Sequence, residues 1–249
     1  MKRFKLVVAY DGTAYCGYQY QPELPTVEGF VNDALSELLG ENIVTIGASR
    51  TDAGVHAFGN VAVFDSDTRI PAEKLALALN TKLADDIRIT ESLEVAADFH
   101  PRKNVIDKTY EYHINTAKIP FPTDRLYSYN VKHNLDIKAM REAAKFIEGR
   151  HDFTSFCSAK TDKEDKVRTV FQIDVEEALR SEFIIRVRGD GFLYNMVRII
   201  AGTLIDVGTG KIEPEFVQEI IRSKERGLAG FTAPPQGLYL AEVYYRRNS

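Results

Sequence analysis

The sequence predicts an α+β fold made of two successive halves, each with the element order β-α-β-β-α-β. Two observations lead to this prediction. Short runs rich in β-branched and aromatic residues, typical of strands, alternate with segments whose apolar residues recur at helical spacing. The same order of elements then occurs a second time along the 249-residue chain. We therefore expect two largely antiparallel sheets, joined side by side, with the helices packed on one face.

The elements of the first half follow from apolar spacing and from the residues that begin and end them. Asp11-Gly12 ends the first strand, Thr26 caps a helix that Gly40 ends, and Pro71 begins a second helix at its first position. The expected elements are strand 4–10, helix 27–39, strands 43–48 and 61–64, helix 71–83 and strand 87–95.

The second half repeats this order with longer connections. Asp136 caps a helix that Gly149 ends, and Gly191 leads into a long apolar helix. The expected elements are strand 109–114, helix 137–148, strands 169–175 and 183–188, helix 192–207, a short helix from Pro214 and strand 238–245. The boundary falls between Pro101 and Asp107, so we divide the chain into residues 1–102 and 103–249.

Composition excludes several classes of protein. Hydrophobic residues make up 44% and charged residues 27%, and no apolar run approaches the roughly 18 residues of a membrane span. The basic N-terminus leads straight into a strand and lacks a signal peptide's apolar region, so we expect a cytoplasmic protein. Two cysteines and five scattered histidines give no ligand spacing for a metal, and no cofactor is expected.

Positive charge is grouped along the chain although the net charge is −4. Such groups are permissive for a nucleic-acid partner, but most groups of this kind are solvated surface. They comprise Lys2, Arg3 and Lys5; Arg102 and Lys103; Lys160, Lys163, Lys166 and Arg168; Arg186 and Arg188; and Arg246 and Arg247.

The chain is organised around the segment Arg50-Thr51-Asp52-Ala53-Gly54-Val55-His56-Ala57, which lies between two expected strands. A guanidinium stands two residues before a carboxylate, and a glycine able to take a positive φ stands two residues after it. Such a loop could hold Asp52 ionised and directed outward. Asp is also common in tight turns, where it only caps backbone N–H groups, and local chemistry alone favours that interpretation.

Two further residues stand out. Arg198 lies in an apolar helix, where a guanidinium needs either a carboxylate partner or a route to the surface. We favour a partner from the other half of the chain, with Asp52 as the candidate. Tyr110 shares a strand face with Tyr112; both could be core aromatics, or Tyr110 could stack on a nucleobase.

These residues belong to motifs that resemble the TruA-type tRNA pseudouridine synthases over nearly the full length. The segment around Asp52 is similar to the catalytic motif of that family. In order, the other matches are Tyr10-Asp11-Gly12-Thr13 with Gly17-Tyr18-Gln19, Phe99-His100 with Arg102, Lys108-Thr109-Tyr110-Glu111-Tyr112, His151-Asp152-Phe153-Thr154-Ser155-Phe156, Gly191-Phe192-Leu193 with Met196-Val197-Arg198, and Pro234-Pro235 before Gly237-Leu238-Tyr239-Leu240. The sequence departs from the family at Tyr194-Asn195, where many members carry His-His, and at Pro101, where Ala is usual.

The resemblance implies an isomerase that converts uridine to pseudouridine at positions 38, 39 and 40 of the tRNA anticodon arm, without a cofactor. It implies a central RNA-binding cleft, a homodimer, and Asp52 as the catalytic carboxylate with Arg198 as its salt-bridge partner. Tyr110 would stack on the target base, Arg50 would fill the space that the base leaves, and Leu238 would line the pocket. Whether Asp52 attacks the base or the ribose, or acts through a glycal, stays open.

Two other functions fit parts of the sequence. A tandem RNA-recognition module also uses β-α-β-β-α-β sheets, but it needs no ionised Asp in a glycine-containing loop. A glycoside hydrolase needs two carboxylates roughly 5 to 9.5 Å apart, whereas the sequence nominates only Asp52.

Overall fold

The computed structural model describes residues 1–158, 161, 164–179 and 181–246, which form two compact units. Unit 1 comprises Met1–Ile106 and the C-terminal segment from Tyr239; unit 2 comprises Asp107–Leu238. The α+β class is confirmed, and the order β-α-β-β-α-β occurs in residues 2–95. The second half contains this order with two additional short strands, Tyr129–Asn130 and Gly149–Asp152, and a further helix, Phe216–Ser223. The last strand groups with unit 1, although the predicted second half, 103–249, includes it. Three residues of the basic groups, Lys160, Lys163 and Arg247, lie outside the described residues.

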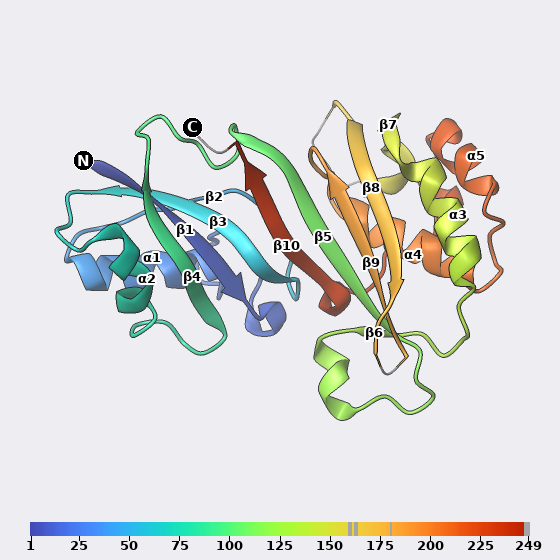
Figure 1. The fold of residues 1–249 in the computed structure, drawn as a ribbon, viewed down its shortest axis with the longest axis horizontal. Helices are drawn as coiled ribbons and strands as arrows, with labels where there is room; N and C mark the ends of the chain where they lie inside the picture. Colours follow the sequence, from blue (N-terminus) through green and yellow to red (C-terminus); the bar gives the residue numbers. More distant parts are fainter. Residues whose placement is uncertain (159–160, 162–163, 180, 247–249) are drawn as a thin grey trace. The chain divides into compact units, whose positions relative to one another are not determined.

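Unit 1 contains a sheet with the strand order β4-β1-β3-β10, in which β2 pairs with β3 (Figure 1). The β1–β3, β1–β4 and β2–β3 pairs are antiparallel and the β3–β10 pair is parallel. The elements are β1 (Lys2–Tyr10), α1 (Val27–Leu39), β2 (Ile46–Gly47), β3 (His56–Ser66), α2 (Ala72–Leu79), β4 (Ile87–Val95) and β10 (Leu238–Tyr245).

Alternation along β1 builds the core of unit 1. Phe4, Leu6 and Val8 are at most 1% exposed, while the residues between them are half-buried. Phe4 stacks on Phe64 of the paired strand with 5.3 Å between ring centroids. Helices α1 and α2 contact one another, and α2 packs against β4. Gly40 ends α1 with a φ of 69°, as predicted for a residue that must take the left-handed conformation.

Two elements of unit 1 are shorter than expected. The predicted strand 43–48 is reduced to β2 because side chains of α1 bind the preceding backbone: Ile43 N donates to Ser36 Oγ and Thr45 N donates to Asn32 Oδ1. Helix α2 ends at Leu79, so the predicted extension to residue 83 is wrong, and Pro71 is its N-cap rather than its first residue.

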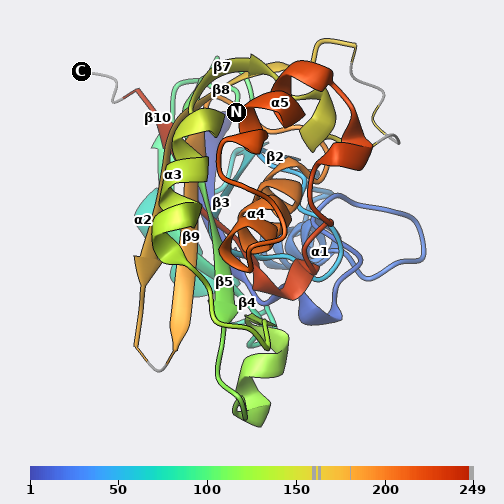
Figure 2. The ribbon, with the colours of Figure 1, turned by 90° about the vertical axis from the view of Figure 1, so that its right-hand side faces the viewer.

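Unit 2 contains the strand order β5-β9-β8-β7, with β6 paired to β5. Helix α3 packs against β8 and contacts α4 and α5. In Figure 2, α3 lies in front of β9. The elements are β5 (Val105–Asn115), β6 (Tyr129–Asn130), α3 (Ile137–Ile147), β7 (Gly149–Asp152), β8 (Val167–Glu177), β9 (Glu182–Gly189), α4 (Met196–Gly208) and α5 (Phe216–Ser223).

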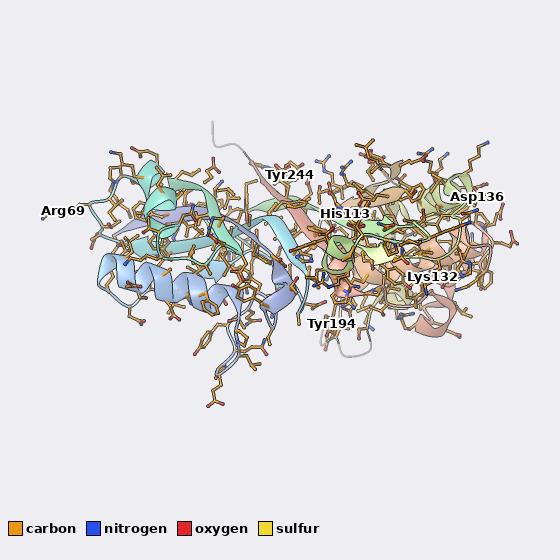
Figure 3. All side chains as sticks on the ribbon, turned by 90° about the horizontal axis from the view of Figure 1, so that it is seen from below. Arg69, His113, Lys132, Asp136, Tyr194 and Tyr244 are labelled. Atoms are coloured by element: carbon orange, nitrogen blue, oxygen red, sulfur yellow. The ribbon has the colours of Figure 1, made fainter. Side chains whose placement is uncertain are left out.

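Capping explains where the helices of unit 2 begin. The Asp136 side chain accepts a hydrogen bond from Ala139 N and caps α3, as predicted; Figure 3 labels this residue. Helix α4 begins at Met196, four residues later than expected, because Asn195 takes a φ of 61° and cannot continue a helix. The segment from Gly191 to Asn195 is therefore a turn that leads into α4.

Candidate active site

The Asp52 loop, residues 48–55, joins β2 to β3. Ala48 N donates to Val61 O (2.7 Å), and Val55 N donates to Asp52 O (3.1 Å), so the loop closes on itself. Gly54 supplies the expected positive φ, 76°. The Asp52 side chain is half-buried beside the exposed Ala53. The carboxylate therefore stands on a closed backbone and keeps access to solvent.

Asn60, a fully buried residue of β3, holds the base of the Asp52 loop. Its amide accepts a hydrogen bond from Ser49 N (3.2 Å) and donates one to Ser49 O (3.0 Å). The same oxygen accepts a hydrogen bond from Val61 N (2.9 Å). One buried side chain thus binds both backbone groups of the residue three positions before Asp52.

The middle of the loop is held by the last residue of β1 and by the segment between β1 and α1. The Thr51 and Tyr10 hydroxyls are 2.7 Å apart, and Tyr18 N donates to Thr51 O (3.1 Å). Gly17 has a φ of 96°, and a Cβ at this position would lie 2.8 Å from Thr51 O. The matches to the TruA family at Tyr10, Gly17 and Tyr18 therefore serve to position the residue before Asp52.

His56 and Gly12 hold the end of the loop. His56 is 2% exposed, and its Nδ1 accepts a hydrogen bond from Gly12 N (3.1 Å) and lies 3.2 Å from Asp11 Oδ1. A Cβ on Gly12 would lie 2.0 Å from Val55 O, so only glycine fits there.

Arg50, on the same loop, is exposed. Its Nη1 lies 3.5 Å from Gln19 Oε1, a long contact that restrains the guanidinium only weakly. The structure therefore places both predicted residues of unit 1, Asp52 and Arg50, on one loop, with the carboxylate half-buried and the guanidinium in solvent.

Tyr110 and Tyr112 of β5 differ in their surroundings. Tyr112 is fully buried, its hydroxyl donates to Pro234 O (2.9 Å), and burial raises its pKa. Tyr110 is half-buried and meets Phe192 edge-on, with 5.2 Å between centroids and 85° between planes. Tyr112 is thus a core aromatic, whereas Tyr110 keeps part of its ring accessible.

Arg198 lies in the first turn of α4 and is half-buried. Its Nε donates to Ala233 O (2.7 Å) and its Nη1 donates to Asn195 Oδ1 (3.0 Å). These two neutral acceptors fix the guanidinium plane within unit 2. Asn195 is one of the positions where the chain departs from the family, and its neighbour Tyr194, labelled in Figure 3, is exposed. The Asp52–Arg198 salt bridge stays a prediction.

The predicted residues of unit 2 gather around the segment 233–238. Arg198 binds Ala233, and its charge opposes the rise in the pKa of Tyr112, which itself binds Pro234. Leu238, 6% exposed, is the first residue of β10. Arg198 and Tyr112 thus bind the successive residues Ala233 and Pro234. That Tyr110, Arg198 and Leu238 form one site with Asp52 and Arg50 stays a prediction.

Sequence reasoning did not single out Asn60 or the role of His56. A signal was available for Asn60, which is a polar residue at the start of an apolar strand run and must find partners when buried. Within the described ranges, no group of three or more His, Cys, Asp or Glu side chains is arranged to hold a metal ion. No helix in the described part of the chain is long and apolar enough to span a bilayer.

The chain is similar to known proteins over nearly its whole length. A family described as tRNA pseudouridine synthase matches residues 6–102 and 143–246. A protein named tRNA pseudouridine synthase A from Brevibacillus brevis is 48% identical over 245 residues, covering 98% of this chain and 100% of that protein. A protein of the same name from Bacillus subtilis is 47% identical over 246 residues, covering 98% and 99%.

Proposed function

Because this chain belongs to the tRNA pseudouridine synthase family, an isomerase family that modifies tRNA, we propose that it converts uridine to pseudouridine at positions 38, 39 and 40 of the anticodon arm. Asp52 is the catalytic carboxylate of this proposal. The observation that carries it is the geometry of the Asp52 loop, in which buried partners fix the residues on both sides of a carboxylate that keeps access to solvent.

The reaction explains why a fixed carboxylate is needed. The glycosidic bond from ribose to the N1 atom of uracil breaks, the base rotates, and a bond to C5 forms. An ionised Asp52 attacks the ribose or the base, or promotes cleavage through a glycal. Arg198 pairs with Asp52 in this proposal and favours its ionised form. The contacts of Arg198 with Ala233 and Asn195 support this role, because they hold its guanidinium in one orientation.

The other predicted residues handle the base. A uridine within a paired or stacked arm must leave the stack before it can react. Tyr110 stacks on the extruded uracil and assists proton transfer at C5; its half-buried ring, supported by the edge of Phe192, suits this role. Arg50, exposed on the Asp52 loop, occupies the vacated space, and Leu238 lines the pocket.

The remaining parts of the proposal concern the partner and the assembly. The partner is tRNA, held in a central cleft by phosphate contacts that give salt-dependent affinity. The protein acts in the cytoplasm as a homodimer, with one tRNA contacting both subunits.

Tritium release from tRNA transcripts that carry 5-³H-uridine tests the proposal. Three transcripts, each with uridine at only one of positions 38, 39 and 40, resolve the sites. Wild type is expected to release tritium from each, and Asp52→Asn from none. Asp67→Asn serves as the matched control, because Asp67 is an exposed carboxylate of unit 1 whose partner is the N-terminal amine. Release by Asp52→Asn at the wild-type rate would contradict the role of Asp52, and no release by wild type would contradict the activity.

A further inference from the structure

Three aromatic rings on β3 and β10 form a stacked row that the proposed chemistry does not use. Tyr239 stacks on His56, with 4.7 Å between centroids and 23° between planes, and on Phe58, with 4.8 Å and 21°. Nearly parallel rings at this spacing are in offset stacking contact. We call His56, Tyr239 and Phe58 the aromatic row.

One end of the row is buried and the other is open. His56 is 2% exposed and Tyr239 7%, whereas Phe58 is 51% exposed. Among the residues of β1, β3, β4 and β10, all of them described, Phe58 is the only large apolar side chain that is exposed. A single open ring is much smaller than the apolar patches, typically a few hundred Å², that mark protein–protein contacts.

An irregularity in β3 accounts for the position of Phe58. Val8 pairs with Asn60 but Tyr10 pairs with Ala57, so β3 contains one residue more than β1 over this step. A bulge of this kind re-aims the side chain beside it. Gly59 follows Phe58, and a Cβ there would lie 3.0 Å from Ala241 O. The bulged backbone thus packs closely on β10, which carries Tyr239.

The row begins where the Asp52 loop ends. Val55 N donates to Asp52 O, and His56 is the first residue of β3. At about 3.3 Å per residue, Phe58 lies about 10 Å along the strand from Val55. This distance is short enough for a nucleotide close to the one being modified.

We infer that the open face of Phe58 stacks on a nucleobase of the bound tRNA, close in sequence to the target uridine. The inference depends on the proposed function for the identity of the ligand. Arg50 occupies the position of the extruded base in the proposed function, so Phe58 stacks on a base beyond that position, which an aromatic side chain can do whichever base is present. Tyr239 and His56 support the ring from behind, so stacking costs little reordering of the protein.

The chain contains no tryptophan, so Phe58→Trp introduces a single tryptophan, whose emission can be excited selectively over that of the tyrosines, at the open end of the row. Adding an anticodon stem-loop RNA is expected to quench its fluorescence and to protect it from acrylamide. Leu77→Trp is the matched control, because Leu77 lies on α2 of the same unit and is 72% exposed. Its fluorescence is expected to be unchanged by the RNA.

Affinity measurements separate stacking from simple burial. Phe58→Leu keeps an apolar side chain but loses the ring, and should weaken stem-loop binding about 5- to 100-fold, as expected for the loss of one base–ring stack. Phe58→Tyr keeps the ring and should bind within about twofold of wild type. Equal binding by Phe58→Leu and wild type, or no quenching of Phe58→Trp, would overturn the inference.

Two further results show what Phe58 contacts and whether the stacking depends on catalysis. If the Phe58→Trp fluorophore is protected without RNA, and Phe58→Asp lowers the molecular mass in solution, Phe58 contacts a second copy of the chain and the inference is wrong. Quenching by RNA from a protein whose wild type forms no pseudouridine would uphold the stacking while contradicting the proposed function.

Discussion

The Asp52 loop of unit 1 and the Tyr110–Arg198 region of unit 2 are held in different ways. Hydrogen bonds from the buried Asn60 amide fix the backbone of the Asp52 loop at Ser49, and the Tyr10 hydroxyl lies 2.7 Å from that of Thr51. The second region combines burial with hydrogen bonds: Tyr112 is buried in β5 and donates to Pro234 O. Arg198, on the buried helix α4, donates to Ala233 O and Asn195 Oδ1. The Asp52 loop is held by a few backbone hydrogen bonds and by the Asn60 and Tyr10 side chains, and the side chains can be removed one at a time.

The largest loss of stability is expected at Gly12, the residue whose backbone packs closest to the Asp52 loop. Gly12→Ala places a Cβ 2.0 Å from Val55 O, so the backbone must shift, and we expect the free energy of unfolding to fall by at least about 4 kcal/mol. Gly40→Ala is the control, because its φ of 69° is strained but nothing lies within 4 Å; about 1 kcal/mol is expected. Chemical denaturation measures both, and equal losses would contradict the close packing.

The amide of Asn60 comes next. Asn60→Ala leaves three buried backbone groups without their partner, so we expect a loss of about 3 kcal/mol in unfolding free energy and a lower turnover per folded molecule. Asn130→Ala removes an amide of unit 2 that binds Asn115 O and Ala117 O, and should cost about 1 kcal/mol without changing turnover. If Asn130→Ala slowed the reaction as much as Asn60→Ala, Asn60 would have no special role in the loop.

The two tyrosines of β5 are expected to separate stability from chemistry. Tyr112→Phe leaves Pro234 O without its donor and should cost about 1 kcal/mol, because the group is buried. Tyr110→Phe keeps the ring against Phe192 and should change stability by less than about 0.5 kcal/mol, while slowing turnover if its hydroxyl moves a proton. Thermal unfolding and tritium release are the measurements; the opposite pattern would mean that the roles of the two residues are exchanged.

The smallest expected effect is the pH dependence of the stability that the Glu111 carboxylate contributes. The His113 imidazole, and then the Arg186 guanidinium, hold the pKa of the Glu111 carboxyl below its ordinary value. A lowered folded-state pKa means that ionised Glu111 stabilises the fold above its unfolded pKa of about 4.3, and that this contribution is lost as the pH falls through the lower folded value. The free energy of unfolding of wild type should exceed that of Glu111→Gln by about 1 kcal/mol near pH 6 and by less near pH 3. Chemical denaturation at the two pH values measures this difference. A difference that grows on acidification would contradict the pairing.

Much of the fold was predictable because the spacing of apolar residues determines whether a long segment forms a helix or a strand. The predicted strands 87–95 and 238–245 coincide with β4 and β10, and the predicted helix 27–39 with α1. The predictions were wrong where a single side chain decides a boundary. Asn32 and Ser36 draw the backbone of residues 43–45 out of the expected strand, and Asn195 delays the start of α4.

The sequence was sufficient to predict where the Asp52 loop lies in the chain, but not which contacts hold it in place. The glycine beside the carboxylate indicates a positive φ, and Gly54 has one. Nothing in the sequence near the loop indicates that Asn60, eight residues after Asp52, binds Ser49. Nothing there indicates that Gly12, from another element, donates a hydrogen bond to His56. These contacts join residues distant in sequence, and only the folded chain brings them together.

The rate of a single turnover at saturating tRNA, measured for wild type and Asp52→Asn, tests the central claim most directly. The account predicts that the rate constant falls at least about a thousandfold, because the carboxylate takes part in the reaction, while tRNA affinity stays within a few fold. A rate constant within tenfold of wild type, from a protein that binds tRNA normally, would contradict it.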